Sequence, residues 1–141
     1  MPIRTATATW EGGLKEGKGS FAGASGVRAA FGFGTRFGDE PGANPEELLA
    51  AAHAACYSMA LSAGLEKAGT PPTKVETKGY CTIEKLEAGF TVTKMRLECR
   101  ASVKGIDAAK FEEIAQATKA GCPISRALAA IPTIELDAKL V

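Results

Sequence analysis

Two of the four cysteines, Cys56 and Cys122, occupy positions from which thiol chemistry could be carried out. Cys56 lies within a run of small residues that predicts the middle of a helix, and Cys122 stands between a glycine and a proline far downstream. A thiol beside a cation exists partly as a nucleophilic thiolate, and a second thiol can then close a disulfide with it. Charged groups for such a site stand just before the helix, at Arg36 and Glu46.

The surroundings of Cys56 decide whether it reacts. One alternative is an inert core residue, because free cysteine is among the most buried residue types. A thiol in the middle of a helix gains little from the helix dipole, so a thiolate at Cys56 requires a cation beside it. Arg28 and Arg36 both precede the helix, and Arg36 is the better candidate because it lies in the glycine-rich segment that leads into it. The other interpretation of Arg36 is a solvated loop residue.

Cys122 has a different local advantage. Pro123 predicts the first position of a short helix, so that Cys122 would be its N-cap, with backbone N–H groups directed at the sulfur. These groups favour the thiolate, and local electrostatics therefore rank Cys122 as the more acidic of the two thiols. The alternative is an ordinary cysteine in a turn.

Glu46 constrains the geometry of any shared site. It precedes Cys56 by ten residues, which is about 15 Å along a helix at about 1.5 Å per residue, so its carboxylate cannot reach Cys56 of its own helix. If both belong to one site, Glu46 comes from an antiparallel copy of the helix in a homodimer, and the small residues around Cys56 permit that approach. The alternative is that Glu46 only complements the helix dipole.

Composition limits the class of protein. The chain has 141 residues, of which 45% are hydrophobic and 23% charged, with a net charge of +1. These values predict one globular domain over residues 1–141 and no nucleic-acid partner. The N-terminus carries no apolar signal segment and no run of eighteen apolar residues occurs, so we expect a cytoplasmic protein without a membrane partner.

The cysteine and histidine count bears on metals. Cytoplasmic thiols stay mostly reduced, no Cys-x-x-Cys pair is present, and His53 is the only histidine. We therefore expect no metal site and interpret His53 as a buried or interface residue with a satisfied hydrogen bond. Cys81 and Cys99 fall on the predicted apolar face of a strand pair, where cysteine is ordinarily a small buried hydrophobic residue.

Periodicity and turn residues predict an α+β fold with a mainly antiparallel sheet. Asn44 is the expected N-cap of a long central helix that runs to about Lys67 and stops at Gly69. Asp107 is the expected N-cap of a second helix that ends near Ala120. The predicted strands cover residues 3–10, 18–21, 27–33, 74–85, 90–103 and 133–140, with a loop at 34–43 and a short third helix at 123–130.

Five short motifs, in order along the whole chain, resemble the OsmC/Ohr family of thiol-dependent hydroperoxide reductases. The arginine ahead of Asn-Pro-Glu-Glu and the helix Ala-Ala-His-Ala-Ala-Cys are similar to the OsmC branch, named after osmotically inducible protein C. The motifs are Trp10-Glu11-Gly12, Thr35-Arg36-Phe37, Asn44-Pro45-Glu46-Glu47-Leu48, Ala51-Ala52-His53-Ala54-Ala55-Cys56 and Ala120-Gly121-Cys122-Pro123-Ile124-Ser125.

This resemblance implies an OsmC-like fold, an intertwined homodimer and two active sites at its interface. It implies that Cys56 is the peroxidatic thiol, that Arg36 and Glu46 activate it, and that Cys122 is the resolving thiol. The Cys56 thiolate would attack an organic hydroperoxide, become a sulfenic acid and form a disulfide with Cys122. The assignment runs against the local ranking of the two thiols, because a cation beside Cys56 can outweigh a helix terminus at Cys122.

The resemblance also implies how the protein is recycled. Family members use an external dithiol, either small or of the lipoyl type, so that no bound cofactor is expected. The implied physiological setting is oxidative and osmotic stress. Two other functions stay open. One is a thiol redox sensor or stress-related binding protein on the same fold without rapid turnover, and the other is a structural dimer in which Cys56 is inert.

Overall fold

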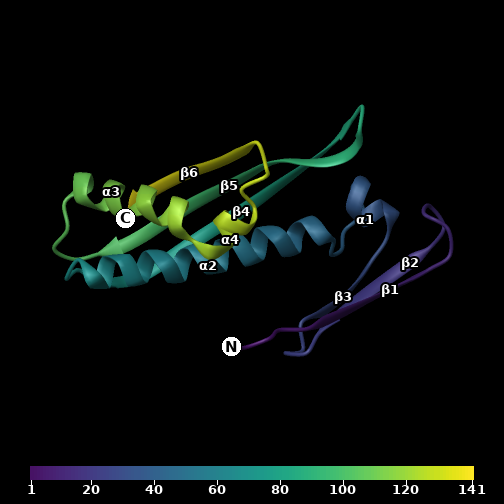
Figure 1. Ribbon diagram of the computed structural model, residues 1–141, viewed down its shortest axis with the longest axis horizontal. Coiled ribbons are helices and arrows are strands. Elements are labelled where there is room, and N and C mark those ends of the chain that lie inside the picture. Colours follow the sequence, from purple (N-terminus) through teal and green to yellow (C-terminus); the bar gives the residue numbers. More distant parts are fainter. The chain divides into compact units, whose positions relative to one another are not determined.

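The computed structural model describes residues 1–141, which form two compact units, residues 1–47 and residues 48–141. The chain combines four helices with six strands, so the predicted α+β class is confirmed (Figure 1). Each unit contains its own three-stranded sheet. The assignment of the whole chain to a single domain stays a prediction.

The N-terminal unit is an antiparallel three-stranded sheet followed by a short helix. Its aromatic rings contact one another along the sheet, with the centroids of Trp10 and Phe31 5.6 Å apart. Very little of the unit is buried within one chain, where only Gly19 and Glu46 lose nearly all solvent contact. Its elements are β1 (Ala6–Glu11), β2 (Lys18–Gly23), β3 (Arg28–Phe31) and α1 (Phe33–Phe37), with strand order β1-β2-β3.

Helix α1 lies where the sequence predicted a loop, so that prediction was wrong for residues 34–37. The glycines of this segment favoured a loop, but two hydrogen bonds between Thr35 and Gly32 stabilise a helical turn. The Thr35 hydroxyl accepts from the N–H of Gly32 at 2.9 Å and donates to the carbonyl of Gly32 at 3.1 Å. This exchange closes a helical turn directly after β3 and places Arg36 in it.

The second unit is a hairpin extended by one crossover strand. Strands β4 (Pro72–Leu86) and β5 (Gly89–Val103) pair antiparallel, as predicted, and β6 (Thr133–Leu140) pairs parallel with β5. Parallel neighbours need a long connection, which here consists of α3 (Ala108–Gly121) and α4 (Pro123–Ala127). Helix α4 ends three residues earlier than predicted.

One core joins the helices to the sheet. Alternate residues of β5 are fully buried and face the helices, which confirms the predicted apolar face of that strand. Helix α2 (Pro45–Lys67) contributes every fourth residue, and α3 closes the other side. The fully buried core cluster consists of Tyr57, Leu61, Leu65, Leu97, Cys99, Ala101, Phe111, Ala115 and Cys122.

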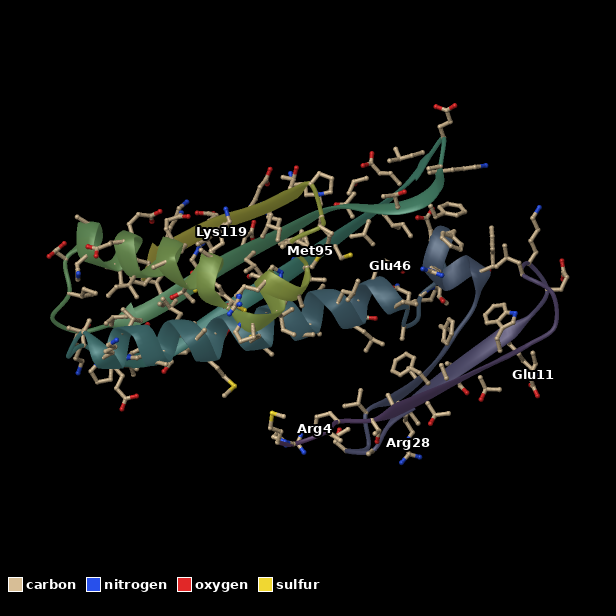
Figure 2. All side chains as sticks on the ribbon, viewed as in Figure 1. Arg4, Glu11, Arg28, Glu46, Met95 and Lys119 are labelled. Carbon is tan, nitrogen blue, oxygen red and sulfur yellow. The ribbon has the colours of Figure 1, made fainter.

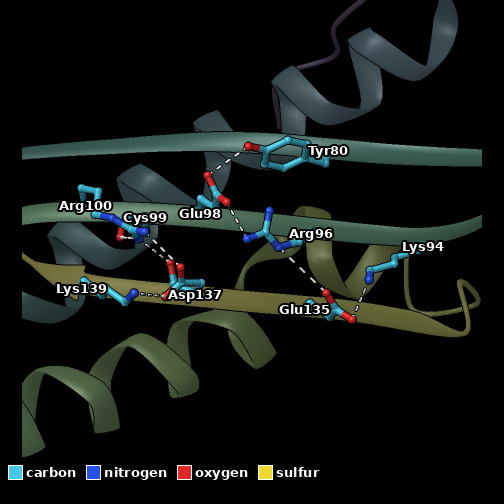
Figure 3. A network of polar contacts seen from close by, with 9 residues as sticks. All are labelled: Tyr80, Lys94, Arg96, Glu98, Cys99, Arg100, Glu135, Asp137 and Lys139. Carbon is cyan, nitrogen blue, oxygen red and sulfur yellow. Dashed lines mark hydrogen bonds and ion pairs between the residues drawn. The ribbon is translucent and has the colours of Figure 1, made fainter.

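The residues of β5 between the core positions are charged and lie on the opposite face of the sheet. Figure 3 shows them in a network of ion pairs within β5 and with β6, to which Tyr80 of β4 adds a hydrogen bond with Glu98. Arg100 meets Asp137 at 3.0 Å and Lys94 meets Glu135 at 2.7 Å. This division of one strand into a buried and a charged face fixes the register of the hairpin.

The predicted helix ends are confirmed. The Glu47 N–H donates to the side-chain oxygen of Asn44 at 2.8 Å, and the Lys110 N–H donates to Asp107 at 2.8 Å. At its C-terminus α2 stops before Gly69, whose φ of 83° lies in the left-handed region that favours glycine.

Helix α2 is apolar on both of its faces. It is long and apolar enough to cross a membrane, with an 18-residue window of mean hydropathy 1.4, but only 22% of that window is buried within one chain. Core helices of water-soluble proteins have the same property, and the buried face of α2 belongs to the core cluster. The absence of a membrane-spanning segment stays a prediction. We call the exposed face the exposed α2 stripe: Leu48, Ala51, Ala52, Ala55, Met59 and Ala63.

Candidate thiol site

Arg36 and Glu46 form a close ion pair, as their expected partnership requires. The guanidinium donates from Nη2 to Oε1 of Glu46 at 2.9 Å and from Nε to both carboxylate oxygens at 3.1 and 3.3 Å. Glu46 is buried at the first turn of α2 (Figure 2), whereas the Arg36 side chain is 37% exposed. The carboxylate therefore holds the guanidinium while leaving one edge of it open to an incoming group.

Asn44 is the residue that brings this pair together. Its side-chain oxygen caps α2, and its side-chain nitrogen donates to the carbonyl of Thr35 at 3.0 Å. One side chain thus ties α1, which carries Arg36, to the start of the helix that carries Glu46. The sequence predicted only the capping role, because the second bond depends on the unpredicted α1.

An apolar cavity of about 200 Å³ opens beside Arg36 within the N-terminal unit. The guanidinium of Arg36 stands 5.0 Å from the centroid of the Phe37 ring, and the rings of Phe33 and Phe37 are 5.1 Å apart. The cavity combines aromatic walls with a single charged group. Its lining residues are Trp10, Leu14, Phe31, Gly32, Phe33, Arg36 and Phe37.

In the second unit the two thiols predicted to react lie together. The Sγ atoms of Cys56, in the middle of α2, and Cys122, at the start of α4, are 3.1 Å apart and hydrogen-bonded. A disulfide bond is about 2.05 Å long, so a shift of about 1 Å between the sulfurs would be enough to form one. The packing of α2 against α3 and α4 brings them into contact although 66 positions separate them.

The two thiols differ in access to solvent. Cys122 is only 1% exposed, whereas Cys56 is half-buried. An oxidant arriving from solution therefore meets Cys56 first, and Cys122 lies behind it. This order of access fits a reactive thiol at Cys56 and a second thiol that acts on the product.

Within one chain the buried thiol, Cys122, is more acidic than the accessible thiol, Cys56. Burial raises the pKa of Cys56, and its hydrogen bond with Cys122 raises it further. Burial also acts to raise the pKa of Cys122, but the Ser125 N–H, the hydrogen bond with Cys56, the Ser125 hydroxyl and the Ile124 N–H together outweigh it and lower that pKa. These pKa directions agree with the sequence-based expectation that Cys122 is the more acidic thiol by its local surroundings. A reactive Cys56 needs a cation that its own unit does not place beside it.

His53 is buried and hydrogen-bonded, as predicted. Its Nε2 lies 2.8 Å from the hydroxyl of Ser125, and its side chain is fully inaccessible. Burial lowers the pKa of His53, so the ring is neutral near pH 7. The sequence did not single out Ser125. Its position three residues after a helix-starting cysteine is the signal that could have found it.

The other predicted positions separate into two groups. Arg36 and Glu46 belong to residues 1–47, and the two thiols belong to residues 48–141. Cys81 on β4 is only half-buried, whereas Cys99 on β5 is buried in the core as predicted. No three His, Cys, Asp or Glu side chains are grouped so as to share a metal ion, and the expected absence of a cofactor stays a prediction.

Comparison with known proteins gives matches along nearly the whole chain. Residues 38–137 match the OsmC-like protein family. Peroxiredoxin OsmC of Escherichia coli strain K12 is 48% identical over 134 residues, which cover 94% of this chain and 94% of that protein.

Solved structures agree in fold. The OsmC-like protein of Mycoplasma pneumoniae has a TM-score of 0.74 at 14% identity, covering 99% of this chain and 98% of that one. The organic hydroperoxide resistance protein OhrB of Bacillus subtilis has a TM-score of 0.67 at 25% identity, covering 97% and 98%. The extent of the family match and the identity to the Escherichia coli protein show that this chain belongs to the OsmC family.

Proposed function

We propose that the protein is a cysteine-based peroxidase that reduces organic hydroperoxides to alcohols. The observation that carries the proposal is the pair of free thiols, 3.1 Å apart, with Cys56 accessible and Cys122 buried behind it. The names of its relatives support the same chemistry, since one is a peroxiredoxin and another an organic hydroperoxide resistance protein.

The reaction follows from the order of access. The Cys56 thiolate attacks the terminal peroxide oxygen, the O–O bond breaks, and the alkoxide leaves as an alcohol after taking a proton. Cys56 is then a sulfenic acid, and the Cys122 thiolate attacks its sulfur and displaces hydroxide, which leaves as water. The product is a Cys56–Cys122 disulfide. Arg36 stabilises the Cys56 thiolate and the charge on the departing oxygen, and Glu46 orients the guanidinium.

A second copy of the chain supplies Arg36 and Glu46 in this proposal. Ten helical residues separate Glu46 from Cys56, or about 15 Å of helix, so one helix cannot bring its own carboxylate to its own thiol. Two copies of α2 packed antiparallel would bring each ion pair to the thiol of the other chain. The raised pKa of Cys56 within one chain fits a site that is incomplete without its partner.

Burial supports this homodimer. The exposed α2 stripe presents six apolar residues on a helix of which only 22% of the most apolar window is buried in one chain. The N-terminal unit buries only Gly19 and Glu46 in one chain, which is too little to stabilise a sheet by itself. A second copy would cover both surfaces, as expected of intertwined subunits.

The cavity beside Arg36 supports organic over inorganic peroxide. Its aromatic walls would hold the alkyl or aryl group of a hydroperoxide, and the guanidinium would lie at the polar end. Hydrogen peroxide has no apolar group to bury there, so we propose that it is reduced more slowly.

We propose that an external dithiol, small or lipoyl-type or carried on a lipoylated protein, reduces the disulfide, with no bound cofactor. The proposed setting is the cytoplasm during oxidative or osmotic stress. The test is steady-state consumption of cumene hydroperoxide with dihydrolipoamide, followed by mapping of the thiols. Turnover with a Cys56–Cys122 disulfide, while Cys81 and Cys99 stay reduced, supports the proposal. Disulfide formation without turnover indicates the redox sensor instead, and four unchanged thiols contradict both.

A further inference from the structure

His53 is a buried titratable group that the proposed reaction does not use. It is the only histidine in the chain and is fully inaccessible to solvent. Its Nε2 lies 2.8 Å from the Ser125 hydroxyl, and its Nδ1 is buried without any hydrogen-bond partner. The Ser125 hydroxyl in turn lies close enough to the Cys122 sulfur to lower its pKa. A continuous chain of polar groups therefore runs from the centre of α2 to the second thiol.

The orphaned Nδ1 identifies which ring nitrogen of His53 carries the proton. A neutral imidazole has one N–H and one bare acceptor nitrogen. A proton on Nδ1 would leave a buried N–H donor without an acceptor, which is rarer and more costly than an unsatisfied lone pair. It would also make the single Ser125 hydroxyl proton point at Nε2 and away from Cys122. With the proton on Nε2, the Ser125 oxygen accepts from His53 and its hydroxyl proton is left to donate to Cys122.

We propose that His53 and Ser125 are positioning residues for Cys122: His53 Nε2–H donates to the Ser125 oxygen and so directs the Ser125 hydroxyl proton at the Cys122 sulfur. The inference rests on the proposed function and deepens it, because Cys122 is the thiolate that forms the disulfide and leaves when it is reduced. Cys122 is 1% exposed, so water cannot replace a missing donor.

Two steps use this arrangement. In resolution, the Cys122 thiolate attacks the Cys56 sulfenic sulfur and hydroxide departs. In recycling, one thiolate of the dithiol attacks the Cys56 sulfur, the S–S bond breaks, and its electron pair stays on Cys122. The second thiol then displaces Cys56 and closes the oxidised dithiol. A leaving thiolate that accepts a hydrogen bond leaves faster, because disulfide exchange speeds up as the pKa of the leaving thiol falls.

The pKa of Cys122 can be measured separately from those of its titratable neighbours. The titratable groups that act on Cys122 are Cys56 and Tyr57 of α2, and the pKa of each is raised. The polar groups of Ser125 and Ile124 lower the pKa of Cys122 against the effect of burial. Cys122 is therefore expected to titrate before either neighbour.

The first experiment is ¹⁵N NMR of the reduced protein labelled at its single histidine. The expected spectrum shows a protonated Nε2 and a bare Nδ1 from pH 6 to 8. A protonated Nδ1 overturns the proposal. No peroxide or dithiol is present, so this result is independent of whether the protein proves to be a peroxidase.

The second experiment follows the Cys122 titration by NMR of ¹³Cβ-labelled cysteine, in a Cys56→Ser background so that one member of the pair titrates. Ser125→Ala and His53→Leu are each expected to raise the midpoint, Ser125→Ala by about one pH unit, the size expected for one lost hydrogen bond to a charged acceptor. His53→Gln and Ser125→Thr, which keep a donor, restore most of the shift. Ser58→Ala, which removes a half-buried hydroxyl of α2 that bonds to Ala54 and Thr77, leaves the midpoint unchanged.

Reduction kinetics then connect the hydrogen bonds to the reaction. With Cys56 restored and the disulfide formed by diamide, Ser125→Ala is expected to slow reduction by dithiothreitol several-fold, and Ser125→Thr to recover the rate. An unchanged midpoint in both Ser125→Ala and His53→Leu overturns the proposal. Failure of peroxide alone to form the disulfide would contradict the proposed function and leave the histidine and cysteine titrations as they stand.

Discussion

The Sγ atoms of Cys56 and Cys122 lie 3.1 Å apart, and yet the two thiols have opposite pKa shifts within one chain. The accessible thiol is the less acidic one, and polar groups at the start of α4 lower the pKa of the buried thiol. A peroxidase needs a thiolate at the accessible position. A thiolate at Cys56 needs a cation beside it. The candidate is Arg36, which forms an ion pair with Glu46 in the other unit, residues 1–47.

Removing the resolving thiol separates the first turnover from recycling. Cys122→Ser is expected to consume one equivalent of hydroperoxide per chain and then nearly stop with dihydrolipoamide as reductant, because the Cys56–Cys122 disulfide that the dithiol is proposed to reduce can no longer form. Stopped-flow measurement of the burst and mass spectrometry of a Cys56 sulfenic acid trapped with dimedone check this. Cys81→Ser serves as the matched control and keeps full turnover. An unchanged steady-state rate in Cys122→Ser would eliminate its resolving role.

Removing the cation shifts the pH profile of Cys56. In the Arg36→Ala variant no guanidinium would oppose the burial that raises the pKa of Cys56. The thiolate fraction near pH 7 falls, and the rate of peroxide attack drops at least tenfold while recovering as the pH rises towards 9. Arg36→Lys recovers part of the rate, since a point charge lacks the bidentate contact with Glu46. A pH profile identical to that of the parent would exclude Arg36 from the site.

The exposed α2 stripe should decide the oligomeric state. Met59→Glu is expected to produce monomers in sedimentation or light scattering, because it places a carboxylate at the centre of the proposed interface. Cys56 in that monomer should also lose its reactivity near pH 7, since Arg36 of the second copy is gone. Ala68→Glu, which adds the same group just past the end of the helix, should leave both properties intact. A monomeric parent protein would contradict the proposed shared site.

The aromatic cavity predicts a split between substrates. Phe33→Ala removes one wall and is expected to lower kcat/KM for cumene hydroperoxide about tenfold, a loss in the range expected for removing part of an apolar pocket, while the value for hydrogen peroxide changes little. Phe21→Ala removes an aromatic ring of strand β2 in the same unit that does not line the cavity, and serves as control. Equal losses for both peroxides would show that the cavity does not hold the organic group.

The sequence predicted well wherever a local rule determines the structure. Capping residues located both long helices, alternation located the hairpin, and β6 was predicted at its observed bounds. Helix α1 was missed because a single threonine hydroxyl outweighs the glycines around it. The contact between the thiols and the cavity beside Arg36 could not be predicted from local rules, since each depends on how distant elements pack. The pairing of Cys56 with Cys122 was instead expected from the resemblance of five short motifs to the OsmC/Ohr family.

The approach of α2 to β4 predicts a position where one methyl group is costly. A Cβ at Gly79 would lie 2.4 Å from the carbonyl oxygen of Ala50 and 3.0 Å from its carbon, both backbone atoms that cannot rotate away. Gly79→Ala should therefore push α2 from the sheet and lower the free energy of unfolding by about 1–3 kcal/mol. Urea denaturation followed by circular dichroism measures this. Gly13→Ala, where a Cβ meets nothing within 4 Å, should be neutral, and equal stability of the two variants would mean that α2 does not pack this closely in solution.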